Sequence, residues 1–200
     1  MLTQLNHLRY DIIYEPLDGE IHCGDQYLVK ELDDSVLVAV ADGLGHGEEA
    51  EFAAKRAIQI LNDYSSLPIE TLVEICDNEL VGTRGTALTI VRVNKNYTLT
   101  YLAVGNVIGV CWKIDDAIHF NKYSFFLEGG IIGSRLVTLP NTKNIAMKSG
   151  DIFILATDGV KGEFEIEKPR FASPQVIAEQ LFKKYRNPKD DGLILVVQLL

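Results

Sequence analysis

The chain has 200 residues, enough for one domain with a full hydrophobic core, and we expect a single domain over residues 1–200. Hydrophobic residues make up 47% and charged residues 24%, which is usual for a soluble globular protein. The net charge of -9 argues against nucleic acid as the main partner, because phosphate backbones are bound by Lys and Arg patches. It is compatible with a phosphorylated protein substrate if metal ions supply the positive charge.

The apolar runs are too short for membrane insertion. They fall far below the ~20 residues that a membrane helix needs, and the N-terminal segment around Arg9 has no signal-peptide core. Cys23, Cys76 and Cys111 are odd in number and lack CxxC spacing, which indicates free thiols in a reducing compartment. We therefore expect a cytoplasmic protein that binds neither membrane nor nucleic acid.

The first half of the chain predicts three strands followed by two helices. The strand-like segments cover Leu8 to Tyr14, Gln26 to Glu31 and Ser35 to Ala41. Asp18-Gly19, between the first two, predicts a hairpin turn. Apolar positions on one helical face predict helices from Glu48 to Tyr64 and from about Pro68 to Leu80.

Strands dominate the second half. Three form an expected meander with turns at Asn94-Lys95-Asn96 and Gly105-Asn106, and they cover Thr86 to Val93, Tyr97 to Val104 and Val107 to Lys113. Shorter candidates cover Ala117 to Phe120, Arg135 to Leu139, Asn144 to Met147 and Asp151 to Ala156. A third helix is expected from about Pro174 to Tyr185, with Ser173 as N-cap, before a last strand from Leu193 to Leu199.

The order of these elements predicts the fold class. Few strands are followed directly by helices, so a parallel doubly wound sheet is disfavoured. Antiparallel sheets covered by helices, an α+β fold, agree better with the pattern.

Three acidic steps stand at the edges of purely apolar runs. Asp42-Gly43 follows one buried strand, Asp158-Gly159 follows another, and Asp190-Asp191 precedes a third. Each alone is explained by a plain turn, as Asp18-Gly19 is. Together they predict one oxygen-rich site for hard divalent cations, because rigid strand ends bring carboxylates close to one another.

The order of these motifs resembles the PPM (type 2C) metal-dependent serine/threonine phosphatases, and within them the small bacterial phosphatases of the RsbX type. The motifs that carry the resemblance are Cys23-Gly24-Asp25, Ala41-Asp42-Gly43-Leu44-Gly45, Arg84-Gly85-Thr86-Ala87, Val104-Gly105-Asn106, Thr157-Asp158-Gly159 and Lys189-Asp190-Asp191. They extend from about Cys23 to the C-terminus. The resemblance implies a four-layer αββα sandwich of two antiparallel sheets flanked by helices.

The resemblance also implies two Mn²⁺ or Mg²⁺ ions. Asp42 would bridge both ions and the carbonyl of Gly43 would bind one, while Asp158 and Asp190 would bind the other. Asp25 would orient metal-bound water or help to hold an ion, and Asp191 would support the ligands or replace Asp190. Two cations lower the pKa of a water and neutralise the phosphate, so no serine or cysteine nucleophile is needed.

The chain departs from the family pattern at two places. Leu44 stands where eukaryotic members commonly have a histidine, which leaves His46 as the candidate general acid or as a plain surface histidine. The phosphate-binding arginine of those relatives has no counterpart before Asp42, which leaves Arg84 as its candidate substitute. The short stretch from Gly159 to Ala172 predicts a reduced flap and an open site.

The function implied is metal-dependent dephosphorylation of phospho-Ser/Thr on STAS-domain stressosome proteins of the RsbR and RsbS types, as negative feedback in bacterial stress signalling. One alternative is an RsbU- or SpoIIE-like phosphatase that acts on a phosphorylated anti-anti-sigma factor. Another is a PPM-fold binding module without turnover.

Overall fold

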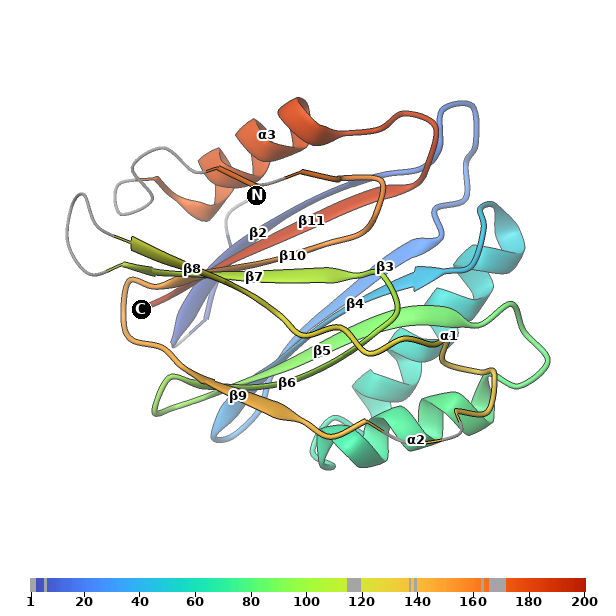
Figure 1. The fold of residues 1–200 in the computed structure, drawn as a ribbon, viewed down its shortest axis with the longest axis horizontal. Helices are drawn as coiled ribbons and strands as arrows, with labels where there is room; N and C mark the ends of the chain where they lie inside the picture. Colours follow the sequence, from blue (N-terminus) through green and yellow to red (C-terminus); the bar gives the residue numbers. More distant parts are fainter. Residues whose placement is uncertain are drawn as a thin grey trace.

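A computed structural model describes residues 3–5, 7–114, 120–136, 138, 140–162, 164–165 and 172–200. Its strands form two antiparallel sheets (Figure 1). Sheet 1 has the spatial order β1 (Thr3–Gln4), β2 (Leu8–Glu15), β11 (Gly192–Leu199), β10 (Ile152–Ala156), β7 (Ile108–Ile114) and β8 (Phe120–Ser124). Sheet 2 has the order β3 (Asp25–Glu31), β4 (Ser35–Gly43), β5 (Thr86–Asn94), β6 (Thr98–Val104) and β9 (Lys143–Ala146).

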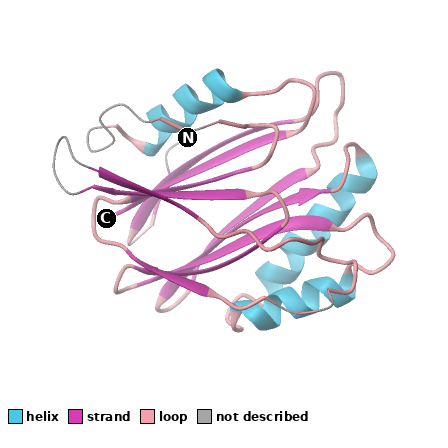
Figure 2. Ribbon diagram, viewed as in Figure 1, coloured by secondary structure: helices cyan, strands magenta, loops and turns pink. Residues whose placement is uncertain are grey.

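Within the described residues, three helices cover the outer faces of the sheets. Helices α1 (Glu48–Asp63) and α2 (Ile69–Glu79) lie outside sheet 2, and α3 (Pro174–Tyr185) lies outside sheet 1 (Figure 2). Helix α3 begins as predicted, with the Ser173 hydroxyl accepting a hydrogen bond from the backbone N–H of Val176. The four layers confirm the predicted α+β sandwich.

The apolar runs in the sequence are explained by burial on both faces of a strand. In β4, Val36, Val38 and Val40 pack between the sheets, while Leu37 and Ala39 pack against α1 and α2. Strands β10 and β11 divide in the same way, because alternate residues face sheet 2 and α3. A strand that is covered on both sides has no polar face, so its sequence reads as one continuous apolar run.

Two predicted connections are wrong. Asp18-Gly19 does form a turn, but β2 and β3 belong to different sheets, so the segment is no hairpin. Likewise β7 does not pair with β6; it pairs with β8 and β10, so the expected meander ends at Gly105-Asn106. In both places the chain crosses from one sheet to the other, which a local turn signal cannot distinguish from a hairpin.

Two other expected strands fall partly outside the described residues. Of the segment from Ala117 to Phe120, only Phe120 is described, as the first residue of β8. Of the segment from Arg135 to Leu139, residues 137 and 139 lie outside the described part, and the remaining three are not in a strand. Half of the predicted short flap from Gly159 to Ala172 also lies outside it.

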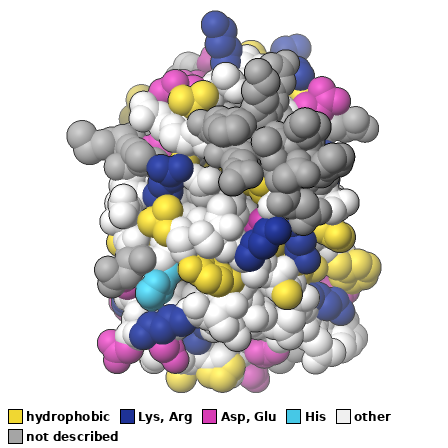
Figure 3. Space-filling model, turned by 90° about the vertical axis from the view of Figure 1, so that its left-hand side faces the viewer, with side chains coloured by type: hydrophobic (Ala, Val, Ile, Leu, Met, Phe, Trp, Pro, Cys, Tyr) yellow, Lys and Arg dark blue, Asp and Glu magenta, His cyan; other side chains and the backbone are white. Residues whose placement is uncertain are grey.

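Two further features concern the charge on the surface and the apolar content of the helices. On the face drawn in Figure 3, the described Lys and Arg side chains form several separate groups with uncharged atoms between them. Among the described residues, none of the helices combines the length and apolar content that a membrane crossing requires.

Candidate metal centre

Carboxylate side chains lie at one end of the layer between the two sheets. Asp42 follows Val38 and Val40 on the face of β4 that points toward sheet 1, because side chains alternate along a strand. Asp25 lies directly opposite Asp42 in the β3–β4 register and is 1% exposed. The strand pairing itself therefore brings two acidic side chains together.

Sheet 1 contributes further acidic residues at the same end. Thr157 follows β10, and its hydroxyl donates a hydrogen bond of 2.6 Å to Oδ2 of Asp25, across the layer between the sheets. Asp158 is the next residue, so this bond places it beside the β3–β4 pair. The electrostatic influence of Asp158 and Asp190 on Asp42 shows that these three carboxylates share one environment.

The two adjacent aspartates before β11 have different surroundings. Asp191 is 3% exposed, and its two oxygens accept the backbone N–H groups of Leu17 and Gly24, each at 2.9 Å. These two hydrogen bonds therefore hold the connection between β2 and β3 against the start of β11 in sheet 1. Asp190 is half-buried, and one of its oxygens accepts the N–H of Asp191 at 3.0 Å. This difference supports Asp190 over Asp191 as the residue that is open to a ligand.

Two of the accompanying glycines are required by close backbone contacts. A Cβ on Gly43 would collide with the carbonyl oxygen of Ala50 in the first turn of α1. A Cβ on Gly159 would collide with the carbonyl oxygen of Asp191. The Asp-Gly steps thus let α1 and the start of β11 lie directly against the carboxylate cluster.

The cluster has a deficit of positive charge. Burial, followed by repulsion from Asp42, raises the pKa of Asp25 well above its ordinary value. Burial, followed by repulsion from Asp158 and Asp190, raises the pKa of Asp42 to about 7. The pKa of Asp190 is also raised, first by burial and then by Asp158. Carboxylates that repel one another in this way are stabilised by a cation placed among them.

The donor set suits Mg²⁺ or Mn²⁺, which prefer carboxylate and carbonyl oxygens. Within the described part of the chain, no three His, Cys, Asp or Glu side chains stand close enough to hold one ion as they are now placed. Several of the carboxylates are hydrogen-bonded elsewhere: Asp25 to Thr157, and Asp158 to Asn106. The chemistry of the donors fits either ion.

Two polar residues at the cluster were given no role from the sequence. The Asn106 amide donates to Oδ2 of Asp158 at 2.9 Å. The Lys161 ammonium lies 3.3 Å from the same oxygen, with a side chain that is 69% exposed. Asn106 ends one of the recognised motifs, so its position was visible, but its partner was not. Lys161 follows Asp158 by three residues, and no sequence signal distinguishes it from a solvated lysine.

His46 and Arg84 form other contacts. Nδ1 of His46 pairs with Oε1 of Glu20 at 2.5 Å, and the His46 side chain is 59% exposed. Arg84 pairs with Glu49 at the start of α1, at 2.6 Å. Neither contact joins the carboxylate cluster, so the roles of general acid and phosphate ligand stay predictions for these two residues.

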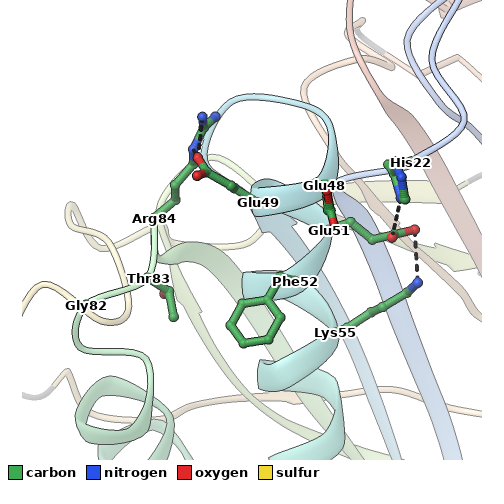
Figure 4. Close-up of a pocket in the computed structure, with 9 residues that line it drawn as sticks. All are labelled: His22, Glu48, Glu49, Glu51, Phe52, Lys55, Gly82, Thr83 and Arg84. Carbon is green, nitrogen blue, oxygen red and sulfur yellow. Dashed lines mark hydrogen bonds and ion pairs between the residues drawn. The ribbon is translucent and has the colours of Figure 1, made fainter.

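A cavity of about 620 Å³ lies beside the first turns of α1. Figure 4 shows Phe52 between the helix and the segment at Thr83, with the Arg84–Glu49 pair at one side and Lys55–Glu51–His22 at the other. Its lining contains none of the predicted metal-binding carboxylates. The chemistry therefore places the candidate site at the carboxylates, outside this cavity.

The cysteines do not provide a nucleophile. All three are free and buried, as the spacing predicted. Burial, with repulsion from Asp25 and Asp191, raises the pKa of the Cys23 thiol to about 12. A thiol that stays protonated at neutral pH is a poor nucleophile, so Cys23 packs beside the cluster without acting in it.

Comparison with known proteins agrees with the fold and the motifs. Phosphoserine phosphatase RsbX of Bacillus subtilis (strain 168) is 26% identical over 184 residues, which cover 91% of this chain and 90% of that protein. A crystal structure of RsbX in complex with magnesium has a TM-score of 0.88 at 24% identity, covering 100% of this chain and 99% of the other.

Two further solved structures match over most of the chain. A chain from a study of the bacterial stressosome as a modular system has a TM-score of 0.85 at 26% identity, covering 96% of this chain and 99% of the other. The catalytic domain of the serine/threonine protein phosphatase PstP, in complex with two manganese ions, has a TM-score of 0.74 at 16% identity, covering 97% and 99%. The latter likeness concerns the fold alone.

A family model assigns the chain directly. The model described as Stage II sporulation protein E (SpoIIE) matches residues 32–199, which include the predicted ligands Asp42, Asp158 and Asp190. The chain belongs to the SpoIIE family of PP2C-type phosphatases.

Proposed function

We propose that residues 1–200 act as one metal-dependent phosphatase domain that removes phosphate from phosphoserine or phosphothreonine in a protein. The observation that carries this proposal is the pairing of buried Asp25 with half-buried Asp42, with Asp158 and Asp190 near them at the edge of the other sheet. A PP2C-type fold with an acidic centre at this point supports hydrolysis by a metal-assisted route.

Asp42, the Gly43 carbonyl, Asp158 and Asp190 are proposed to hold two Mg²⁺ or Mn²⁺ ions. Magnesium in the RsbX crystal structure and two manganese ions in the PstP domain support this choice of ion. When bound, the ions would neutralise the phosphate and lower the pKa of an attacking water.

The chain's own residues prepare this site in two ways. Thr157 holds the Asp25 carboxylate in place at the back of the cluster. Asp191 fixes the β2–β3 connection, and with it the start of β3, relative to sheet 1. Both contacts keep acidic groups from two sheets at a constant separation.

The proposed substrates are phosphorylated STAS-domain proteins of the stressosome, of the RsbR and RsbS types, in the cytoplasm. The likeness to RsbX and to a chain from a stressosome study supports this class. Dephosphorylation of such proteins would act as negative feedback in bacterial stress signalling.

The test measures phosphate release from a phosphorylated STAS protein, with Mn²⁺, with Mg²⁺ and with EDTA. Asp158→Asn removes one proposed ligand and keeps the shape of the side chain. Asp18→Asn is the matched control, because it changes another Asp-Gly step that lies in an ordinary turn. We expect metal-dependent release that Asp158→Asn reduces by orders of magnitude and Asp18→Asn leaves intact.

Other outcomes discriminate between the alternatives. Release that persists in EDTA, or that survives Asp158→Asn, would contradict the metal mechanism. Release from a phosphorylated anti-anti-sigma factor but not from RsbR- or RsbS-type proteins would indicate that the substrates are anti-anti-sigma factors. Tight binding of the phosphoprotein without any release would indicate a binding module.

A further inference from the structure

Asn106 occupies a position that the fold has built with close contacts. It lies in the turn between β6 and β7, where the chain crosses from sheet 2 to sheet 1. The preceding Gly105 has a φ of 91° and packs against Ala87, where an added Cβ would approach the Ala87 Cβ to 2.5 Å. Ala87 is the direct partner of Asp42 in the β4–β5 register. The turn therefore packs against the β4–β5 strand pair, which contains Asp42.

From this turn the Asn106 amide reaches a carboxylate that follows a strand of sheet 1. Its Nδ2 donates to Oδ2 of Asp158 at 2.9 Å. The turn that carries this amide packs against Ala87, the direct strand partner of Asp42. A primary amide has two N–H donors, so one group can serve two carboxylates. Asp42 belongs to sheet 2 and Asp158 follows a strand of sheet 1, so the amide links the two halves of the centre.

We propose that Asn106 is a positioning residue that sets the relative orientation of Asp42 and Asp158, and through them the separation of the two bound ions. This inference rests on the proposed function. The residue type fits the task, since an amide donates hydrogen bonds without adding another negative charge to the cluster. Each carboxylate has several lone pairs, so a bond to Asn106 leaves others for an ion. Groups that orient metal ligands in this way commonly change metal affinity or activity 10–100-fold when removed.

The test uses the full chain and Mn²⁺ as the probe. Asn106→Ala removes the amide, and Asn106→Leu keeps its approximate shape without the donors. Asn96→Ala is the control, because Asn96 lies in the β5–β6 turn and accepts only a local bond from the Thr98 N–H. Calorimetry gives the stoichiometry and affinity of Mn²⁺, and electron paramagnetic resonance reports whether two bound ions are magnetically coupled.

For wild type and Asn96→Ala we expect two coupled ions. For both Asn106 variants we expect the weaker ion to bind about 10–100-fold less tightly, with loss of the coupled spectrum. We also expect kcat to fall while the KM for a phosphoprotein changes little. Urea unfolding midpoints close to wild type would exclude a folding defect.

Two results distinguish a failure of the role proposed for Asn106 from a failure of the proposed function. If the Asn106 variants bind both ions with wild-type affinity and keep the coupled spectrum, Asn106 does not position the ligands. If wild type itself binds no Mn²⁺ and releases no phosphate, the proposed function fails instead.

Discussion

Asp25 and Asp42 lie directly opposite each other, at the start of β3 and near the end of β4. Burial, followed by repulsion from Asp42, raises the pKa of Asp25, and burial, followed by repulsion from Asp158 and Asp190, raises the pKa of Asp42. This arrangement destabilises the metal-free protein, and we infer that a bound cation reverses the destabilisation.

The first prediction concerns pH. The pKa of Asp42 is about 7 in the folded protein, against about 4 in an unfolded chain. The stability that protonated Asp42 contributes is therefore fully present below about pH 4 and is lost as the pH rises through about 7. In EDTA, urea denaturation should give a lower free energy of unfolding at pH 8 than at pH 5, by on the order of 2 kcal/mol.

Asp42→Asn supplies the control for that experiment. The variant has no titrating carboxyl at this position, so the pH dependence should flatten and the metal-free protein should become more stable at pH 8. Stabilisation by Mg²⁺ should weaken in the same variant, because a proposed ligand is gone. An unchanged pH profile in Asp42→Asn would show that the dependence arises elsewhere.

The second prediction separates Asp191 from its neighbour. Asp191→Ala would leave the half-buried N–H of Leu17 and the buried N–H of Gly24 without their acceptor. We expect the free energy of unfolding to fall by about 3 kcal/mol, since hydrogen bonds to charged groups contribute more than neutral ones. The exposed Asp33→Ala should change it by less than about 0.5 kcal/mol. A small effect of Asp191→Ala in chemical denaturation would contradict a structural role.

The third prediction concerns Lys161. Its ammonium pairs with Asp158 at 3.3 Å and so competes with any cation for that carboxylate. Lys161→Met should tighten Mg²⁺ binding about 2–5-fold, as expected for loss of an exposed ion pair. Lys55→Met, which removes a pair with Glu51 on α1, is the control. Competition with a metal-sensitive dye measures both, and weaker Mg²⁺ binding by Lys161→Met would refute the competition.

The fourth prediction concerns Cys23. Since burial and nearby carboxylates keep its thiol protonated, Cys23→Ala should retain most of the phosphatase activity. Iodoacetamide at neutral pH should leave wild-type activity intact for the same reason. Rapid inactivation that is absent in Cys23→Ala would point to a reactive thiol.

Local patterns were sufficient for most elements and insufficient for the connections between them. The run ending at Asp42 reads as a strand because both its faces are buried, and α3 is marked by Ser173 and Pro174. The turns at Asp18-Gly19 and Gly105-Asn106 carry the same residues as hairpin turns, yet each leads to the other sheet. The choice between sheets depends on packing across the whole layer, which no short segment encodes.

For the candidate site, the sequence likewise revealed some of the residues and not others. Asp42, Asp158 and Asp190 were visible because a carboxylate beside a buried strand is unusual in sequence. The contacts of Asn106 and Lys161 with Asp158 were not visible. The Asn106 bond joins residues that are 52 positions apart in the sequence, and the Lys161 pair depends on the path of the chain after β10. The difference between Asp190 and Asp191 likewise needs the β2–β3 connection, which is distant in sequence and supplies the two N–H donors.

The most direct measurement is a calorimetric titration of the metal-free protein with Mn²⁺, for wild type and Asp42→Asn. Asp42 is the proposed bridge between two ions, so wild type should bind two ions per chain, and Asp42→Asn should lose the high-affinity binding of both. Phosphate release assayed on the same samples should follow occupancy. Absence of saturable binding in wild type, or two ions held with unchanged affinity by Asp42→Asn, would contradict a two-metal centre at these carboxylates.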